Sequence, residues 1–319
     1  DGTTKLAHEI EKYASSTGEL VAWVKIPTLA TSTDTVLYMY YGGATTTVQA
    51  SSTGVWDANF VMVQHLEEGN VATTTDSTSN AKDGTKESAT TPSAISTGTI
   101  DGAQSFGHPS GGSIAIPYTN LGSNLTYSVW FQRTGATQSD LISYMNTLFR
   151  IEDTYFAYWS DTSGGGISGS WTSSTLWTYG AVSQTGTACN ILWNATLITS
   201  GTCSAVNTAS SNGYIGNSNG WKWPGNIDEV RISNTGRSAG WLVTEYNNQS
   251  SPSTFYSTST EEALATAPQA GTPFRLRMLL HVGAADLSAS GQDFTLQYAG
   301  AGTSTFFFYD IGTTEIYTD

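Results

Sequence analysis

The clearest strand in the sequence is Gly225-Asn226-Ile227-Asp228-Glu229-Val230-Arg231-Ile232-Ser233, where β-branched residues are interleaved with polar ones between turn residues. Such short runs are typical of β-strands. Turn residues separate several of them at the spacing of a sandwich or jelly roll. The sequence therefore predicts an all-β fold, with one helix at Ser238–Asn248. The other runs lie at Ile114–Ile116, Leu125–Phe131, Leu148–Trp159, Ile191–Ile198 and Tyr214–Ile215.

The composition supports this fold class. Charged residues make up 12% of the 319 residues and aromatic residues another 12%. Disordered chains are poor in aromatic side chains, so we expect packed cores. Tyrosine, tryptophan and the β-branched residues favour pleated, half-buried surfaces.

The charge balance excludes one class of partner. Twelve basic and 26 acidic residues give a formal net charge of −14, whereas nucleic-acid binding needs a basic surface. The same charge disfavours anionic membrane surfaces. No apolar run approaches the ~18 residues of a membrane span, and the polar segment from Asp1 does not resemble a signal peptide. We expect no nucleic-acid partner and no membrane insertion in this segment.

The pattern along the chain indicates four parts: a partial β domain at 1–50, a jelly roll at 51–256, a linker at 257–273 and a partial β-sandwich unit at 274–319. The first part holds too few strands to bury a core. The last part also begins a sheet without finishing it. We expect their open edges to recruit strands, either from other parts of a longer chain or from a neighbouring copy.

The two cysteines, Cys189 and Cys203, have no third to form a metal site with them. They therefore suit one disulfide. The residues between them predict a hairpin that turns near Asn194-Ala195 and brings the two thiols together. A disulfide is typical of an oxidising compartment, so we expect a secreted, extracellular protein.

The carboxylates do not form the pattern of a glycosidase. Such enzymes need two carboxylates that flank the scissile bond, and the sequence has no Glu-x-Asp-x-x-Glu run. Asp228 and Glu229 are adjacent, so on a regular strand they point to opposite faces. The acidic pairs at 67–68 and 152–153 fail for the same reason. We expect no enzymatic activity.

Two groups of segments carry a resemblance to known families. The first group is Leu6–Glu11, Ala22–Pro27 and Tyr38–Gly42; the second is Ile100–Phe106, Gly225–Ser233 and Arg237–Trp241. The first group resembles an uncharacterised β domain of bacterial surface proteins, of the YMYYG type. The second group resembles the LamG-like jelly roll, the concanavalin A-like lectin and glucanase fold, which often follows that domain. This resemblance is specific for the fold class and not for a ligand.

A calcium ion is the cofactor that the sequence allows. The turn from Asp76 to Asn80 is rich in the oxygen atoms that calcium prefers. The resemblance to LamG-like jelly rolls, which often hold calcium at loop edges, implies that Asp76 and Asn80 lie near Asp228. These three residues are the candidate ligands of a structural Ca²⁺. The alternative is that Asp76 and Asn80 form an Asx-turn and that Asp228 caps a neighbouring loop.

Tryptophans in turns rich in Gly and Asn or Ser are the candidate sugar-binding residues. Sugar binding on this fold uses aromatic faces together with amide and carboxylate hydrogen bonds. We select Trp221 and Trp223, together with Trp171 and Trp177, and note that Trp159 lies in a loop of similar composition. The alternative is that these large side chains cover the core.

These observations favour a non-catalytic extracellular surface module for adhesion or glycan recognition, with a glycan or surface polymer as its partner. The alternative is a structural subunit of a surface filament or appendage, assembled from copies of itself through β-strand contacts. A glycoside hydrolase is the least favoured, because the carboxylate pair is missing.

Overall fold

The chain folds into two compact units, and both are built mainly from antiparallel strands. Unit 1 combines Asp1–Trp56 with Asn247–Asp319, and unit 2 is Asp57–Tyr246. The computed structural model describes residues 4–29, 35–40, 50–88, 90–107, 112–135, 138–152, 154–161, 165–172, 174–208, 210–217, 220–252, 275–280, 293–301, 305–307 and 315–317.

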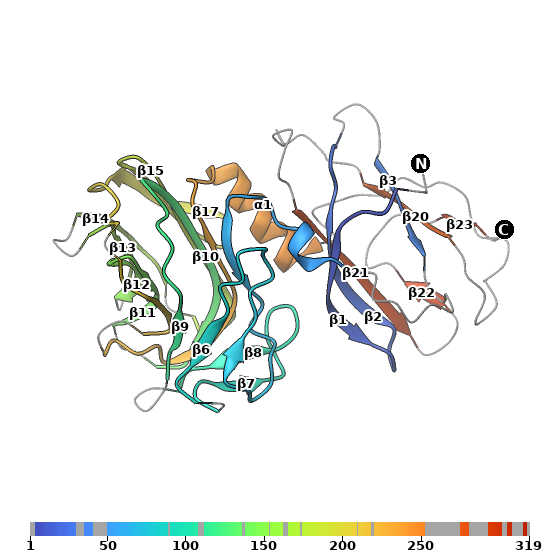
Figure 1. Ribbon diagram of the computed structural model, residues 1–319, viewed down its shortest axis with the longest axis horizontal. Helices are drawn as coiled ribbons and strands as arrows, with labels where there is room; N and C mark the ends of the chain where they lie inside the picture. The colour runs from blue at the N-terminus through green and yellow to red at the C-terminus, as the bar shows by residue number, and fades with distance from the viewer. Residues whose placement is uncertain are drawn as a thin grey trace. The chain divides into compact units, whose positions relative to one another are not determined.

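Unit 2 is a sandwich of two eight-stranded sheets (Figure 1). The β10 sheet contains β4 (Phe60–Gln64), β7 (Ser93–Ile95), β8 (Ala103–Ser105), β10 (Asn124–Arg133), β15 (Thr178–Thr185), β16 (Ala188–Trp193), β17 (Thr196–Thr202) and β19 (Gly225–Ser233). Its order is β17-β16-β15-β10-β19-β8-β7, and β4 also pairs with β19. This confirms the predicted all-β sandwich.

The second sheet of unit 2, the β12 sheet, contains β5 (Thr73–Thr74), β6 (Gly84–Lys86), β9 (Ile114–Ile116), β11 (Ser139–Tyr144), β12 (Thr147–Glu152), β13 (Tyr155–Trp159), β14 (Gly166–Ser170) and β18 (Gly213–Ile215). Its order is β14-β13-β12-β11-β18-β9-β6-β5. The main core fills the space between the two sheets, because every second residue of each strand points inward.

Strand β10 shows how the sequence produces this packing. Tyr127, Val129 and Phe131 alternate into the core between the sheets. Trp130 points to the other face, where it joins a second apolar cluster with Tyr179 and Leu242. The helix α1 (Ala239–Ser250) supplies Leu242 and covers this face of the β10 sheet (Figure 1).

The helix begins where the sequence predicts it. The backbone N–H of Trp241 donates a hydrogen bond to the Ser238 hydroxyl at 3.1 Å, which is the bond of an N-cap. Just before it, Arg237 forms an ion pair with Asp57 at 2.8 Å. This ion pair joins the first residue of unit 2 to a residue close to its last.

Unit 1 contains two smaller sheets. One has the order β1-β2-β21-β22 and the other has the order β23-β20-β3. Trp23 is one of its buried apolar residues, 1% exposed, with its ring 5.3 Å from that of Trp56. The strands are β1 (His8–Ala14), β2 (Glu19–Lys25), β3 (Thr35–Tyr40), β20 (Arg275–Leu280), β21 (Asp293–Ala301), β22 (Thr305–Phe307) and β23 (Glu315–Tyr317), and a 3₁₀ turn covers Ser52–Gly54.

The pairing in unit 1 corrects the expected division of the chain. We expected separate partial units at 1–50 and 274–319, with missing strands supplied from elsewhere. Instead β2 pairs with β21, so that Val24 lies opposite Phe294. Strand β3 pairs with β20 in the same way. The open edges predicted for the two segments therefore meet each other, and a strand from a neighbouring copy is not needed for these pairs. The expected linker at 257–273 lies outside the described residues.

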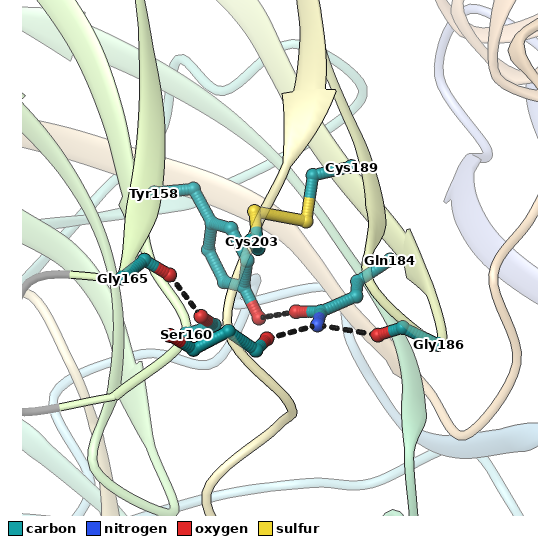
Figure 2. Close-up of a disulfide and its surroundings, with 8 residues drawn as sticks. Tyr158, Ser160, Gly165, Gln184, Gly186, Cys189 and Cys203 are labelled. Atoms are coloured by element: carbon teal, nitrogen blue, oxygen red, sulfur yellow. Dashed lines mark hydrogen bonds between the residues drawn. A yellow bond between two sulfur atoms is a disulfide. The ribbon is translucent and has the colours of Figure 1, made fainter.

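The two cysteines form the predicted disulfide, which ties β16 to the residue that follows β17 (Figure 2). Strand β17 is the last strand of the β10 sheet. The hairpin between β16 and β17 turns at Asn194 and Ala195, whose φ angles are 43° and 63°. Positive φ at both positions is the geometry of a type I′ turn, which favours Asn-Gly. Ala195 occupies the second position against its steric preference.

A hydrogen-bonded network surrounds this disulfide (Figure 2). The Tyr158 hydroxyl donates to the Gln184 side-chain oxygen at 2.7 Å. The Gln184 amide nitrogen donates to the backbone oxygens of Gly186 and Ser204, each at 2.7 Å. The chain that leaves β17 is therefore held by covalent and polar contacts to β15 and β16.

Loss of the disulfide should destabilise unit 2. The bond links residues separated by 14 positions, and closing a loop of this length contributes about 3 kcal/mol in the chain-entropy model. We expect the free energy of unfolding of the double variant Cys189→Ala/Cys203→Ala to be lower by that amount. The variant should therefore unfold at a lower urea concentration than the oxidised wild type. The wild-type protein with its disulfide reduced is the matched control and should unfold with the variant. Equal midpoints for oxidised and reduced wild type would contradict the prediction.

Candidate functional site

The strand β19 contains an irregularity at its acidic pair. Glu229 has a φ of 50°, and the register with β10 shifts between Ser128 and Trp130. This is a β-bulge, which places one extra residue in β19. Asp228 lies opposite Trp130 and Arg231 lies opposite Ser128. The bulge breaks the regular alternation, so Asp228 and Glu229 do not point to opposite faces as we expected.

Glu229 is the centre of a buried charged network. Its two carboxylate oxygens contact His65 Nδ1 at 2.6 Å and an Arg231 guanidinium nitrogen at 2.7 Å. Arg231 also lies 3.7 Å from Glu245 of α1, and the Tyr179 hydroxyl donates to Glu245 at 3.0 Å. All five side chains are buried. The network therefore holds the β10 sheet and α1 together within unit 2.

The environment separates the pKa values of the two neighbouring carboxyls. Burial would raise the pKa of Glu229, but His65 and Arg231 outweigh that effect and lower it. Burial raises the pKa of Asp228 well above its usual range, and the negative charge of Glu229 raises it further. Both side chains are 1% exposed. Both carboxyl groups are therefore enclosed within the protein.

The candidate calcium ligand Asp76 is surrounded by hydrogen-bond donors from the protein. One carboxylate oxygen accepts from the backbone N–H groups of Val63 and Thr78, at 2.9 and 3.0 Å. The other accepts from the Thr78 hydroxyl and the Lys82 N–H, at 2.8 and 2.7 Å. The Asn80 amide nitrogen donates to the backbone oxygens of Phe60 and Val61. These are the contacts of an Asx-turn that fixes the loop to β4.

The third candidate ligand, Asp228, binds a different loop. One of its oxygens accepts from the backbone N–H of Thr99 at 2.6 Å, and the other accepts from its neighbour Glu229 at 2.9 Å. A Cβ atom on Gly98 would lie 2.6 Å from the carboxylate, so the loop passes close to it. Asp228 thus caps the loop. No observation tests whether calcium also binds, and the calcium site stays a prediction.

Two of the four candidate sugar-binding tryptophans lie in the core. Trp223 is 0% exposed and packs edge-to-face against Phe131 at 5.3 Å. Trp171 is 5% exposed and contacts the same phenylalanine at 6.0 Å. Trp177 is partly buried against the cluster beneath α1. For Trp223 and Trp171 the expectation of an accessible ring is wrong, because the space between the sheets is filled by large aromatic side chains.

Trp221, in contrast, is exposed. It precedes Trp223 by two residues in the turn before β19, and 44% of its surface is accessible. The Arg150 guanidinium lies over its ring, 5.6 Å from the ring centroid. The backbone oxygen of Trp221 accepts a hydrogen bond from the N–H of Asp140 at 3.1 Å. The indole is therefore anchored to β11 and β12 while part of it remains open to solvent.

Arg150 is fixed by acidic neighbours. It forms two hydrogen bonds with Asp140, at 2.7 and 3.2 Å, in the bidentate geometry that suits a guanidinium. Its other nitrogen lies 3.6 Å from Glu152, and Glu152 accepts a hydrogen bond from Gln138 at 2.8 Å. A cation held in this way over an aromatic ring fixes the ring's orientation.

Strand register places further aromatic residues on this side of the β12 sheet. Glu152 lies opposite Tyr155, and Leu148 lies opposite Trp159. Ser143 lies opposite both Leu148 and Tyr214. Since residues 148, 150 and 152 alternate with inward-facing ones, all these partners share the outer face. We call Trp221, Tyr214, Trp159, Tyr155 and Arg150 the aromatic face.

The aromatic face is partly open to solvent. Tyr155 is 48% exposed and Tyr214 is 39% exposed. The four strands from β18 to β13 that carry it span about 14 Å at the usual spacing of strands. Exposed aromatic side chains gathered on one face are more informative than single ones, because such patches often mark binding surfaces. From this group, sequence reasoning selected Trp221 and noted Trp159 as a tryptophan in a similar setting.

One signal in the sequence could have found Arg150. Phe149 and Ile151 alternate with Leu148, Arg150 and Glu152, which predicts that the latter share a face. The pairing of β12 with β13, which brings Tyr155 and Trp159 to that face, has no comparable local signal.

The N-terminal segment has a counterpart among known families. Residues 1–79 match DUF2341, a domain of unknown function. The match includes the region that resembles an uncharacterised domain of surface proteins. No curated protein matches this chain in sequence. The LamG-like character of unit 2 stays a prediction.

Three solved structures are similar to part of this chain. The binding domain of Paraclostridial Mosquitocidal Protein 1 shares 15% identity, over 59% of this chain and 52% of that chain, with a TM-score of 0.48. Domain 4 of AbnA, a GH43 extracellular arabinanase from Geobacillus stearothermophilus in complex with arabinotriose, shares 18% identity over 58% of this chain and 97% of that one, with a TM-score of 0.47. The binding domain of botulinum neurotoxin serotype D/C shares 9% identity over 63% and 54%, with a TM-score of 0.44.

This chain therefore spans about half the length of the first of these structures. Because all three TM-scores lie below 0.5, these similarities carry no argument about the function of this chain. Among the described residues, no helix is long and apolar enough to cross a membrane.

Loss of the Glu229 carboxylate should destabilise unit 2. In the variant Glu229→Gln the buried Arg231 would lose its closest carboxylate, and breaking a buried pair in this way costs about 3–5 kcal/mol. We expect the urea midpoint of unit 2 to fall accordingly, measured by tryptophan fluorescence. Glu152→Gln is the matched control, because Glu152 is partly exposed and its loss should change stability by less than about 0.5 kcal/mol. The same midpoint for both variants would show that the network is not structural.

Proposed function

We propose that unit 2 is a non-catalytic glycan-recognition module of an extracellular surface protein, with an adhesive role, and that the aromatic face is its binding surface. The observation that carries this proposal is the exposed Trp221 ring, anchored by Arg150 on the outer side of the β12 sheet. An amphipathic ring that is held in place presents a large apolar area at little cost in conformational entropy.

The chemistry of the aromatic face suits a neutral sugar. The C–H groups of a sugar ring can pack against the flat face of an indole or phenol, while its hydroxyls need hydrogen-bond donors and acceptors. Arg150 supplies donors, Glu152 supplies acceptors and Gln138 supplies an amide. The sheet holds these groups on a rigid support, which reduces the entropy lost on binding.

The carboxylates on this face favour binding over hydrolysis. Asp140 is 0% exposed and is paired with Arg150. Of the two carboxylates that contact Arg150 in the described part of the chain, only Glu152 is therefore partly open to solvent. A glycosidase needs two accessible carboxyl groups on either side of the scissile bond. This arrangement supports the non-catalytic part of the proposal.

The variant Trp221→Ala should lose glycan binding. We expect the full chain to bind a subset of glycans saturably on an array, and the variant to bind the same glycans about 30-fold more weakly, since an anchoring tryptophan contributes about 2 kcal/mol. Titration calorimetry with the best glycan gives the two dissociation constants.

The control for this experiment is Leu176→Ala. Leu176 is 73% exposed but lies outside the aromatic face, so its loss should leave affinity unchanged. Binding that survives Trp221→Ala unaltered would exclude the aromatic face as the binding surface. The absence of any saturable glycan binding by the wild-type chain would exclude the proposed function itself.

The calcium prediction has a separate test. An ion that binds only the folded state raises the melting temperature by mass action. If Asp76, Asn80 and Asp228 hold calcium, the melting temperature of the wild-type chain should be higher in millimolar calcium than in EDTA, and Asp76→Asn should abolish the difference. Magnesium at the same concentration is the control for ionic strength. Coincident melting curves in calcium and EDTA would rule out a structural calcium ion.

A further inference from the structure

One lysine lies inside the sandwich of unit 2. Lys86 of β6 is opposite Ile114, a core residue, so its side chain points between the sheets. It is 3% exposed. Its ammonium nitrogen, Nζ, contacts the side-chain oxygen of Gln104 at 2.9 Å and the backbone oxygen of Gly69 at 3.5 Å. In the described part of the chain no carboxylate lies within ion-pair distance of Nζ.

This environment disfavours the charged form of the lysine. Burying an ammonium without a paired carboxylate costs several kcal/mol, and such groups lose their proton instead. Burial lowers the pKa of Lys86, although the more distant Glu68 acts in the opposite direction. A lowered pKa increases the share of the neutral amine, and the neutral amine is the nucleophilic form.

The partner of Lys86 is an amide in a fixed orientation. Gln104 of β8 is 0% exposed and lies opposite Ile227 of the core. Its amide nitrogen donates to the backbone oxygens of Leu66 and Glu68, at 3.1 and 2.7 Å. These two bonds leave the amide oxygen pointing at Lys86 Nζ. The carbonyl carbon Cδ, bonded to that oxygen, is therefore close to the amine.

A carboxylate with a spare oxygen completes the group. One oxygen of the Glu68 side chain accepts a hydrogen bond from the backbone N–H of Thr75. The other oxygen is buried and has no hydrogen-bond partner in the described part of the chain. A buried carboxylate oxygen without a partner is unusual and needs an explanation. A role in proton transfer beside Lys86 and Gln104 provides one.

We propose that Lys86 and Gln104 form an intramolecular isopeptide bond, with Glu68 as the proton-transfer group. The neutral Nζ of Lys86 attacks Cδ of Gln104, and a new C–N bond forms. Glu68 takes a proton from Nζ and delivers it to the Gln104 amide nitrogen. The bond from Cδ to that nitrogen then breaks, and one molecule of ammonia leaves. The products are an amide that links the two side chains and free ammonia, so the step needs no oxidant, reductant or co-reactant.

The bond would join the two sheets of unit 2. Strand β6 belongs to the β12 sheet and β8 belongs to the β10 sheet. The disulfide lies at the opposite edge of the β10 sheet, where it links β16 to the residue after β17. The isopeptide bond therefore adds a covalent link at a place where the sheets are otherwise held by packing.

The intact mass of the full chain tests the proposal. We expect the purified and fully reduced wild-type chain to be lighter than its sequence by one molecule of ammonia. Protease digestion should release a branched peptide that contains both Lys86 and Gln104. The variants Lys86→Arg, Gln104→Leu and Glu68→Gln should each have the mass of the unlinked sequence. Lys82→Arg is the matched control and should retain the loss of ammonia, because the Lys82 Nζ atom donates to the backbone oxygen of Tyr118.

Three results would overturn the proposal. The first is a wild-type mass equal to that of the sequence after prolonged incubation of the folded protein. The second is a loss of ammonia that peptide mapping assigns to another residue, such as an asparagine. The third is a loss of ammonia that persists in Lys86→Arg. The wild-type measurement does not depend on whether any variant folds.

Discussion

Strand β19 is covered on both of its faces, and every polar side chain that it carries must therefore find a partner inside the protein. Ile227, Val230 and Ile232 enter the core between the sheets. On the other face Arg231 contacts Glu245, which ties α1 to the strand. The bulge at Glu229 makes this possible, because it brings a second carboxylate to the guanidinium without removing an apolar residue from the core. The position of the helix and the closure of the core both follow from this one strand.

Local patterns in the sequence were sufficient for much of the fold. The strand at Leu125–Phe131, the start of the helix at Ser238 and the hairpin between the cysteines each depend on residues close together in the chain, and each prediction is confirmed. The pairing of β2 with β21 could not be found in this way, since alternation reports which face is buried but not which distant strand lies beside it. The same limit produced the wrong division into two partial terminal units.

The candidate site shows the same limit at the level of single side chains. Trp221 and Trp223 have similar neighbours in the sequence, yet one ring is exposed and the other is fully buried. What separates them is the position of Phe131 and Arg150, which come from different strands. The bulge at Glu229 could not be predicted from the sequence either. A positive φ usually occurs at glycine or asparagine, and here it occurs at a glutamate. Tertiary contacts therefore decide which aromatic and acidic residues are available for binding.

The ion pair between Asp57 and Arg237 has a consequence for the order in which the chain folds. Unit 1 is formed by two segments of the chain that lie on either side of unit 2 in the sequence. Strand β2, with Val24, can pair with β21 only after Phe294 has been synthesised. During synthesis the whole of unit 2 leaves the ribosome between these two strands, and a domain can fold while the rest of the chain is still being made. Once it has folded, its first and last residues are held near each other. Loop-closure entropy depends on the length of free chain between the two ends. Because unit 2 has already folded, only the free chain outside it still has to be closed when β2 pairs with β21. Folding of the inserted unit 2 therefore lowers the entropy lost when the strands of unit 1 pair with each other.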